Sequence, residues 1–229
     1  MRSSLFRYFP DRPELEATLS AFEALLASPT NEESLQRFLA ANPWILEHTF
    51  TTYWSQSLVI PKFNLGNEFQ TDFLLLCWGA SANPCIQLIE IEPSDSVVFT
   101  KSGDPASRLV HAMRQVVDWS NWIRKNEDFF HREVARAASK VLATVSHHGA
   151  EYEMDESSGR DWRWFWERRL DGLLPTHQLK ILIGRRAQLT NQDIEKRNSF
   201  RSLNDVHFEV ISYDRLLDCL KKMTEHRST

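Results

Sequence analysis

Three acidic residues are spaced so that two neighbouring strands could bring them together. Asp72 opens the apolar stretch DFLLLCW, and Glu90 and Glu92 close the stretch CIQLIEIE. Side chains alternate between the two faces of a strand, so Glu90 and Glu92 share a face that is otherwise apolar. A face that turns acidic where the strand ends predicts a site at the edge of a sheet.

These residue types suit the hydrolysis of phosphodiesters. Carboxylates that converge repel one another unless a cation lies among them, and Mg²⁺ binds a few carboxylate oxygens together with waters. Such an ion orients a water, lowers the pKa of that water and neutralises charge on a phosphate. The alternative from spacing alone is that Asp72 only starts a strand, while Glu90 and Glu92 are solvated or paired with arginines.

The elements that must position these acids follow from apolar periodicity. The order of segments, αα-βββ-α(α)-β-α-β-α, predicts an α/β sandwich with a mixed central sheet and N-terminal helices. The predicted helices cover residues 13–27, 31–42, 107–126, 128–145, 191–200 and 215–223, and the predicted strands cover 57–63, 70–78, 85–92, 179–185 and 206–213.

The composition predicts one main folded domain. The chain has 229 residues, of which 42% are hydrophobic, and this excludes disorder. No apolar run reaches the roughly 20 residues of a membrane helix and the N-terminus lacks a signal-peptide pattern, so we expect a cytoplasmic protein without a membrane partner. The net charge of −4 means that any nucleic-acid binding must use a local basic patch. The three cysteines show no metal-binding or disulfide spacing, so we interpret Cys77, Cys85 and Cys219 as core residues.

Several strings, taken in order, resemble the nuclease domain of the Shedu antiphage proteins, which belongs to the PD-(D/E)XK superfamily. These strings are LQRFLAANPWIL, TDFLLL, LIEIEPSD, LKILIGR and VHFEVISYDRLL, between about residues 31 and 220. The resemblance implies a restriction-endonuclease-like mixed sheet flanked by helices. It implies a helical extension at 1–30 and a nuclease-like domain at 31–229, and the polar stretch within 147–171 reads as an insertion.

The resemblance also implies an activity, which is metal-dependent DNA cleavage in antiviral defence. Asp72 and Glu90 match the metal-binding acids of the family, and the Ile91 carbonyl is a further ligand. The metal would be Mg²⁺ or Mn²⁺ and the partner DNA. Shedu relatives assemble as homo-oligomers, and the helix before residue 31 could serve that purpose or could cap the core of this chain.

Glu92 departs from the family pattern, because it lies where lysine is usual. Three hypotheses follow. Glu92 binds a second metal or orients water, so the site is active; or the site has lost catalysis and keeps only binding; or Lys62 or Lys101 supplies the amine from elsewhere. Each of them keeps Asp72 and Glu90 at the centre of the site.

The helix that follows the acidic strand carries a polar stripe. Arg108, His111 and Gln115 recur at three and four residues and could face DNA, as could Lys101 before the helix. Gln115 resembles, with Trp119, a Gln-xxx-Tyr pair of related nucleases, in which it would steady a phosphate or a metal-bound water. The alternative is that Gln115 lies on a solvated face.

Two further features have competing interpretations. Glu33 could be an extra metal ligand, but an acid in the first turn of a helix also complements the helix dipole. The segment DWRWFWERRL at 161–170 combines tryptophans with arginines, which suits either core packing or stacking on bases. If the chain were instead a structural partner in a defence complex, the surface around Trp162 would be its contact.

Overall fold

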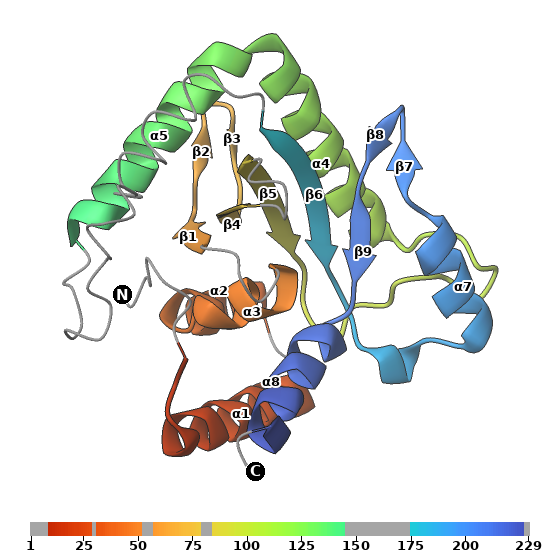
Figure 1. Cartoon of the computed structure of the whole chain (residues 1–229). Helices are drawn as coiled ribbons and strands as arrows, with labels where there is room; N and C mark the ends of the chain where they lie inside the picture. The colour runs from red at the N-terminus through yellow and green to blue at the C-terminus, as the bar shows by residue number, and fades with distance from the viewer. Residues whose placement is uncertain (1–8, 29–30, 52–56, 79–83, 145–174, 227–229) are drawn as a thin grey trace.

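The computed structural model describes residues 9–28, 31–51, 57–78, 84–144 and 175–226 (Figure 1). Helices and strands follow one another largely as the apolar pattern predicts. The helices are α1 (Arg12–Ala27), α2 (Glu32–Ala41), α3 (Trp44–Phe50), α4 (Ser107–Lys125), α5 (Glu127–Thr144), the short 3₁₀ helix η3 (Arg186–Gln188), α7 (Asn191–Ser199) and α8 (Asp214–His226). The strands are β1 (Ser57–Pro61), β2 (Asn64–Leu65), β3 (Phe69–Gln70), β4 (Phe73–Trp78), β5 (Pro84–Ile91), β6 (Thr176–Leu182), β7 (Ser202–Leu203), β8 (Val206–His207) and β9 (Glu209–Ile211).

A mixed five-stranded sheet organises the molecule, in the order β1-β4-β5-β6-β9. β1, β4 and β5 form the predicted antiparallel meander, whereas β6 and β9 run parallel to β5. Parallel neighbours need long crossovers, and here the helices supply them. The predicted α/β class with a mixed central sheet and flanking helices is therefore confirmed.

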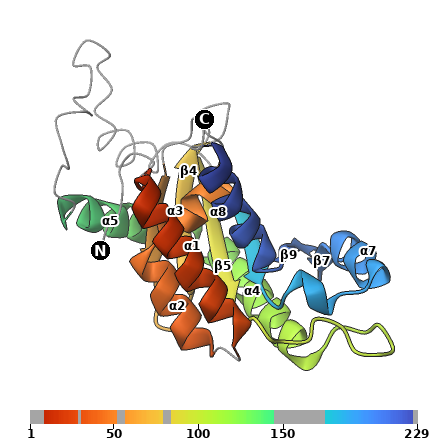
Figure 2. The same cartoon turned by 90° about the horizontal axis from the view of Figure 1, so that it is seen from below.

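Each face of the sheet carries its own hydrophobic core. On one face, Leu74 and Leu88 pack with residues of α4 and α5, such as Met113 and Phe130. On the other face, the core is completed by α1, α2, α3 and α8, and Figures 1 and 2 show these helices gathered on that side. Because successive strand residues alternate between these cores, the register decides which face each acid joins.

The first helix packs on the last one. Phe22 and Leu26 of α1 are buried in the same core as Leu216 and Leu220 of α8. Glu23 Oε1 of α1 also forms an ion pair with Lys221 Nζ of α8 at 2.9 Å. The sequence left two roles open for this helix, oligomer assembly and capping of the chain's own core. The contacts in the structure are those of a core cap.

The predicted strand at 206–213 is wrong as a single element. Val206 and His207 form β8 and pair with β7, and only Glu209–Ile211 join the central sheet as β9. The cause is a tight hairpin, in which Asn204 and Asp205 both have positive φ, at 51° and 63°. This backbone conformation favours hairpin turns and redirects the chain before it reaches the sheet.

Two short elements follow features that the sequence predictions passed over. After the predicted end of the second helix at Asn42-Pro43, the chain starts again as α3. The turn residues around Gly66, which has φ +61°, close a two-stranded hairpin of β2 and β3.

Cys77 and Cys85 are free and buried as predicted, whereas Cys219 is only partly buried. None of the helices in the described ranges combines the length and the apolar character needed to cross a bilayer.

Candidate functional site

The predicted acids meet where β4 begins and β5 ends. The antiparallel register pairs Phe73 with Ile89, so Asp72 lies opposite Glu90. The N–H of Ile91 donates to Asp72 Oδ2 at 2.9 Å. The exposed fractions are 4% for Asp72, 6% for Glu90 and 3% for Glu92. Three carboxylates are therefore held in the interior by the ladder itself, which fixes the side-chain directions.

A lysine from the neighbouring strand reaches this group. Lys62 follows β1 directly, and its Nζ donates to Asp72 Oδ1 at 2.5 Å. The Lys62 backbone N–H also donates to the Asp72 carbonyl at 2.8 Å. Lys62 has φ +52°, which is uncommon outside glycine and costs of order 1–3 kcal/mol. Of the two lysines considered from sequence, the described contacts join Lys62 to the acids, whereas Lys101 is exposed on the loop before α4.

Glu92 is bound to the helix that follows it. Arg108 Nη1 of α4 donates to Glu92 Oε2 at 3.1 Å, and Arg108 remains 57% exposed. The Glu92 backbone is fixed on both sides, since its N–H donates to the Leu182 carbonyl and its carbonyl accepts from the Tyr213 hydroxyl, both at 2.8 Å. Glu92, for which the resemblance implied a departure from a usual lysine, is thus the partner of an arginine.

The electrostatics single out Glu90. Burial raises the pKa of Glu90 to about 10, and the neighbouring Asp72 adds to this shift. Among the described residues, no lysine or arginine forms an ion pair with Glu90. Burial also raises the pKa of Glu92, although Arg108 opposes the shift. Burial and Asp72 thus both favour the protonated form of Glu90, and a cation at this point would favour the carboxylate.

A fourth acid, Glu32, was missed. Burial raises the pKa of Glu32, with Asp72 and Glu92 as the next causes, so this side chain is directed toward the acidic group. Glu33, which was considered as an extra ligand, is exposed and pairs with Arg37 at 2.6 Å. The signal was available, because Glu32 lies three residues before the buried Leu35 and hence on the inner face of α2.

The polar stripe of α4 begins at the acids and ends in the core. Arg108 and His111 both lower the pKa of Glu92, which places them beside it. Gln115 lies one turn further along, and its Oε1 is buried without a hydrogen-bond partner in the part of the chain that the structure describes. Trp119, which sequence grouped with Gln115, is 1% exposed and packs in the core of the α4 face. Only Gln115 of that pair carries a free polar atom.

The acidic group offers oxygen donors of the kind that a divalent metal binds. Within the described ranges, no three His, Cys, Asp or Glu side chains are already arranged as a ligand set. Mg²⁺ does not require three, since it is commonly bound by one or two carboxylates together with waters and substrate phosphates. Asp72 and Glu90, with the backbone at Ile91, supply oxygens of that kind. The predicted insertion at 147–171, including Trp162, lies outside the described residues.

These features define an α/β protein of nuclease-like architecture, with a mixed sheet, flanking helices and buried carboxylates at the strand ends. The family described as Shedu protein SduA, C-terminal, matches residues 30–217, and the chain belongs to this family. Membership indicates a role in antiphage defence. No curated protein matches the chain.

Proposed function

We propose that the chain is a metal-dependent DNA endonuclease of the PD-(D/E)XK superfamily that acts in antiphage defence. The single observation that supports it best is the contact of 2.5 Å between Lys62 Nζ and Asp72 Oδ1, beside the strand end that carries Glu90. Two acids and an amine at one end of the central strands are the groups that phosphodiester hydrolysis uses. The missing lysine after Glu90 is then replaced by Lys62, which directly follows β1.

Asp72, Glu90 and the Ile91 carbonyl would hold Mg²⁺ or Mn²⁺. In a strand, the N–H and C=O of one residue point toward the same neighbour, and the Ile91 N–H points to Asp72. The Ile91 carbonyl is therefore directed to the same side. A bound divalent ion supplies a water of lowered pKa and neutralises charge on the phosphate.

The remaining polar groups have roles that follow from their charges. The Lys62 ammonium can donate to an oxygen that becomes negative during hydrolysis, which is the role of the usual lysine. Glu92 orients Arg108, whose other N–H groups have no acceptor among the described residues and would be available to a DNA phosphate. Gln115, whose buried Oε1 has no hydrogen-bond partner among the described residues, would accept from a water or donor that reaches this end of the site. Lys101, exposed on its loop, would add charge for the DNA backbone.

The experiment is cleavage of supercoiled and linear DNA with Mg²⁺, with Mn²⁺ and with chelator. Wild type should cleave only with metal, and Glu90→Gln should lose cleavage by on the order of 100-fold or more while it keeps its fold. Glu133→Gln, in an exposed ion pair with Arg136 on α5, is the matched control and should cleave like wild type. Cleavage that survives in Glu90→Gln or in chelator would contradict the proposal.

A second candidate is a catalytically degenerate module that binds DNA or a protein without cleaving. It is favoured by the ion pair of Glu92 with Arg108 at the position of the usual lysine. Glu92→Lys separates the two candidates. A gain of cleavage would indicate a degenerate site that the lysine restores, and a loss would indicate that Glu92 works in an active one.

A further inference from the structure

A cavity of about 440 Å³ opens beside the edge strand β9, on the side of α7. Figure 1 shows α7 and the β7–β8 hairpin next to this edge of the sheet. Guanidinium groups dominate its polar lining, which consists of Arg186, Arg197, Arg201, Arg215, Asn198 and Ser212, with Glu209 as an acid. Its volume falls within the roughly 300–1,000 Å³ typical of small-ligand sites.

Two of the arginines are neutralised by acids. Arg186 forms an ion pair with Asp218 at 2.6 Å, and Arg215 pairs with Glu209. Glu209 also accepts from the buried Lys180 at 2.9 Å, so this one carboxylate serves two cations. The carboxylates of Asp218 and Glu209 are therefore already paired with cations. The basic side chains around the cavity still outnumber these two acids.

The other two arginines have no acidic partner within the described part of the chain. Arg197 Nη2 donates to Asn198 Oδ1 at 3.3 Å, and Arg201 Nε donates to the Asn198 carbonyl at 2.6 Å. These contacts use neutral acceptors and leave most of the five N–H donors of each guanidinium free. Burial is the main effect that lowers the pKa of Arg197; the charges of Glu209 and Asp214 raise it, but repulsion from Arg186 is stronger than either and lowers it further. An anion in the cavity would relieve this repulsion.

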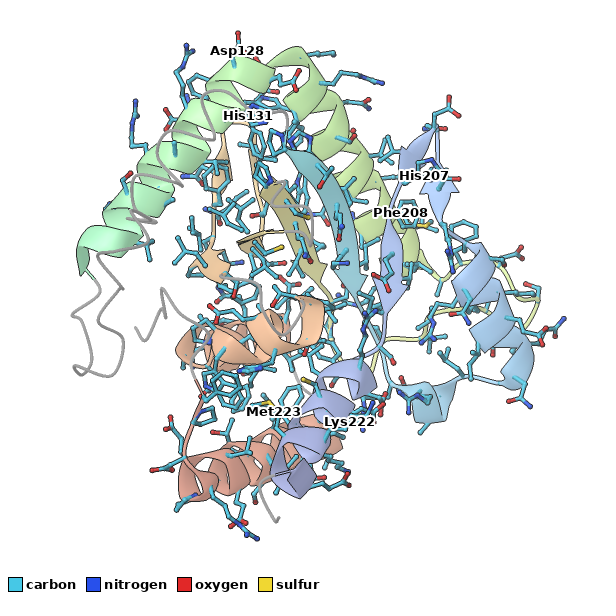
Figure 3. The ribbon with its side chains drawn as sticks, viewed as in Figure 1. Asp128, His131, His207, Phe208, Lys222 and Met223 are labelled. Carbon is cyan, nitrogen blue, oxygen red and sulfur yellow. The ribbon has the colours of Figure 1, made fainter. Side chains whose placement is uncertain are left out.

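The inner wall of the cavity does not favour recognition of a base. Phe208, labelled in Figure 3 where β8 meets β9, also lines the cavity, but it is 5% exposed and packs in the core with Phe200. Its ring is not free to stack on a ligand. The polar lining thus selects for charge and for the planar, bidentate geometry of guanidinium contacts.

The cavity lies at the same end of the sheet as the acids. The register pairs Ile91 with Leu182 and Leu182 with Ile211, so β9 is two strands away from the acidic strand end. With strands about 4.8 Å apart, the separation of Ile91 and Ile211 along the sheet is about 10 Å. A ligand in the cavity would therefore lie near, but apart from, the acidic group.

From these observations we propose that the cavity binds a phosphate ester, through Arg197 and Arg201, with Arg186 and Arg215 around them. The phosphate belongs either to a free nucleotide or to a nucleic-acid strand, since both present the same group. This binding needs no metal, and it stands whether or not the acidic group cleaves DNA.

The experiment measures binding of two probes to the full chain in chelator, which prevents metal-dependent cleavage. The probes are deoxyadenosine monophosphate, followed by calorimetry, and a fluorescein-labelled oligothymidylate, followed by fluorescence anisotropy. The double variant Arg197→Gln/Arg201→Gln should bind on the order of tenfold more weakly, because it loses charge-assisted hydrogen bonds. Arg197→Lys keeps the charge but loses the bidentate geometry and should give an intermediate affinity.

The matched control is Arg124→Gln. Arg124 lies in the last turn of α4 and donates to Asn121 Oδ1, as Arg197 lies in the last turn of α7 and donates to Asn198. The control removes the same charge and the same kind of contact far from the cavity, and it should bind like wild type. Thermal unfolding of each variant shows that the fold is kept.

The two probes distinguish the sources of the phosphate. An arginine-dependent loss for the mononucleotide alone identifies a nucleotide site, and a loss for the oligothymidylate alone identifies a nucleic-acid strand. In the second case, the slope of log K against log salt should also fall by about 0.7 for each lost phosphate contact. If the folded double variant binds both probes as wild type and Arg124→Gln do, the proposal is overturned.

Discussion

The acidic group and the arginine cavity lie at the same end of the sheet, yet they are built in opposite ways. The acids belong to central strands and are at most 6% exposed, whereas Arg186 and Arg215 of the cavity are 51% and 47% exposed. Burying like charges is costly unless a counter-ion joins them, while exposed arginines cost little. Under the two proposals above, the acids would therefore take a cation and the arginines an anion.

The largest effect on DNA cleavage is expected from removing the Lys62 amine beside the acids. Lys62→Met should lower metal-dependent DNA cleavage by on the order of 100-fold, because one preorganised donor to the reacting phosphate is lost. Lys101→Met is compared with it, because Lys101 is exposed on a loop and would only add charge for the DNA backbone, and this variant should retain most of the activity. Initial cleavage rates of the two variants are compared. The opposite result, with Lys101 essential and Lys62 dispensable, would remove Lys62 from the site.

A smaller effect separates two neighbouring acids of α2. Glu32→Gln should weaken Mn²⁺ binding about tenfold, as the loss of an outer partner of a metal site typically does. Glu33→Gln should leave the affinity unchanged, because Glu33 pairs with Arg37 on the surface. Electron paramagnetic resonance of free Mn²⁺ gives both affinities. Equal effects of the two changes would mean that Glu32 acts only through the overall charge of the helix.

Residues of the acidic site could be predicted from the sequence where they lie in a periodic helix or strand. Asp72, Glu90 and the strands that carry them were predictable, because register and alternation fix where a strand residue points. Glu32 could have been found from the buried stripe of α2, but Glu33 was named since first-turn acids look alike in sequence. Lys62 was only one of two lysines, because its approach depends on a left-handed backbone at the end of β1 that the sequence does not signal.

The arginine cavity was not predictable in the same manner. Its arginines come from η3, α7, the segment after α7 and α8, and no motif joins these positions in the sequence. The predicted single strand at 206–213 also concealed the hairpin at Asn204 and Asp205 that shapes this edge. Surface charge clusters form from residues that are distant in sequence, so periodicity carries little information about them.

The residue that links the two regions should affect stability moderately. The Tyr213 hydroxyl, fully buried, donates to the Glu92 carbonyl at 2.8 Å, and Tyr213 lies next to Ser212 of the cavity lining. Tyr213→Phe leaves that buried carbonyl without its donor and should lower the free energy of unfolding by about 1–2 kcal/mol. Urea unfolding measures the change. An unchanged stability would show that the two regions are held independently.

The smallest effect concerns the pH dependence at the start of α8, below the cavity. Burial raises the pKa of Asp214, but hydrogen bonds from Arg185 and from the Arg186 N–H outweigh it, so the pKa is lowered overall. An acid with a lowered pKa stabilises the fold above its unfolded value, about 3.9, and this contribution is lost as the pH falls through the folded value. Asp214→Asn should therefore be less stable than wild type at pH 7 and approach it below pH of about 3.9.

Melting curves of both proteins across that range measure this convergence. The effect is small because asparagine keeps an acceptor oxygen for the same N–H groups. Arg185→Gln removes the main source of the lowered pKa of Asp214. Its stability should therefore also depend less on pH in the acid range than that of wild type. A difference between wild type and Asp214→Asn that stays constant down to low pH would mean that the charge of Asp214 does not stabilise this corner. Asp214 would then hold Arg185 and the backbone of Arg186 beside the cavity without any contribution from its charge.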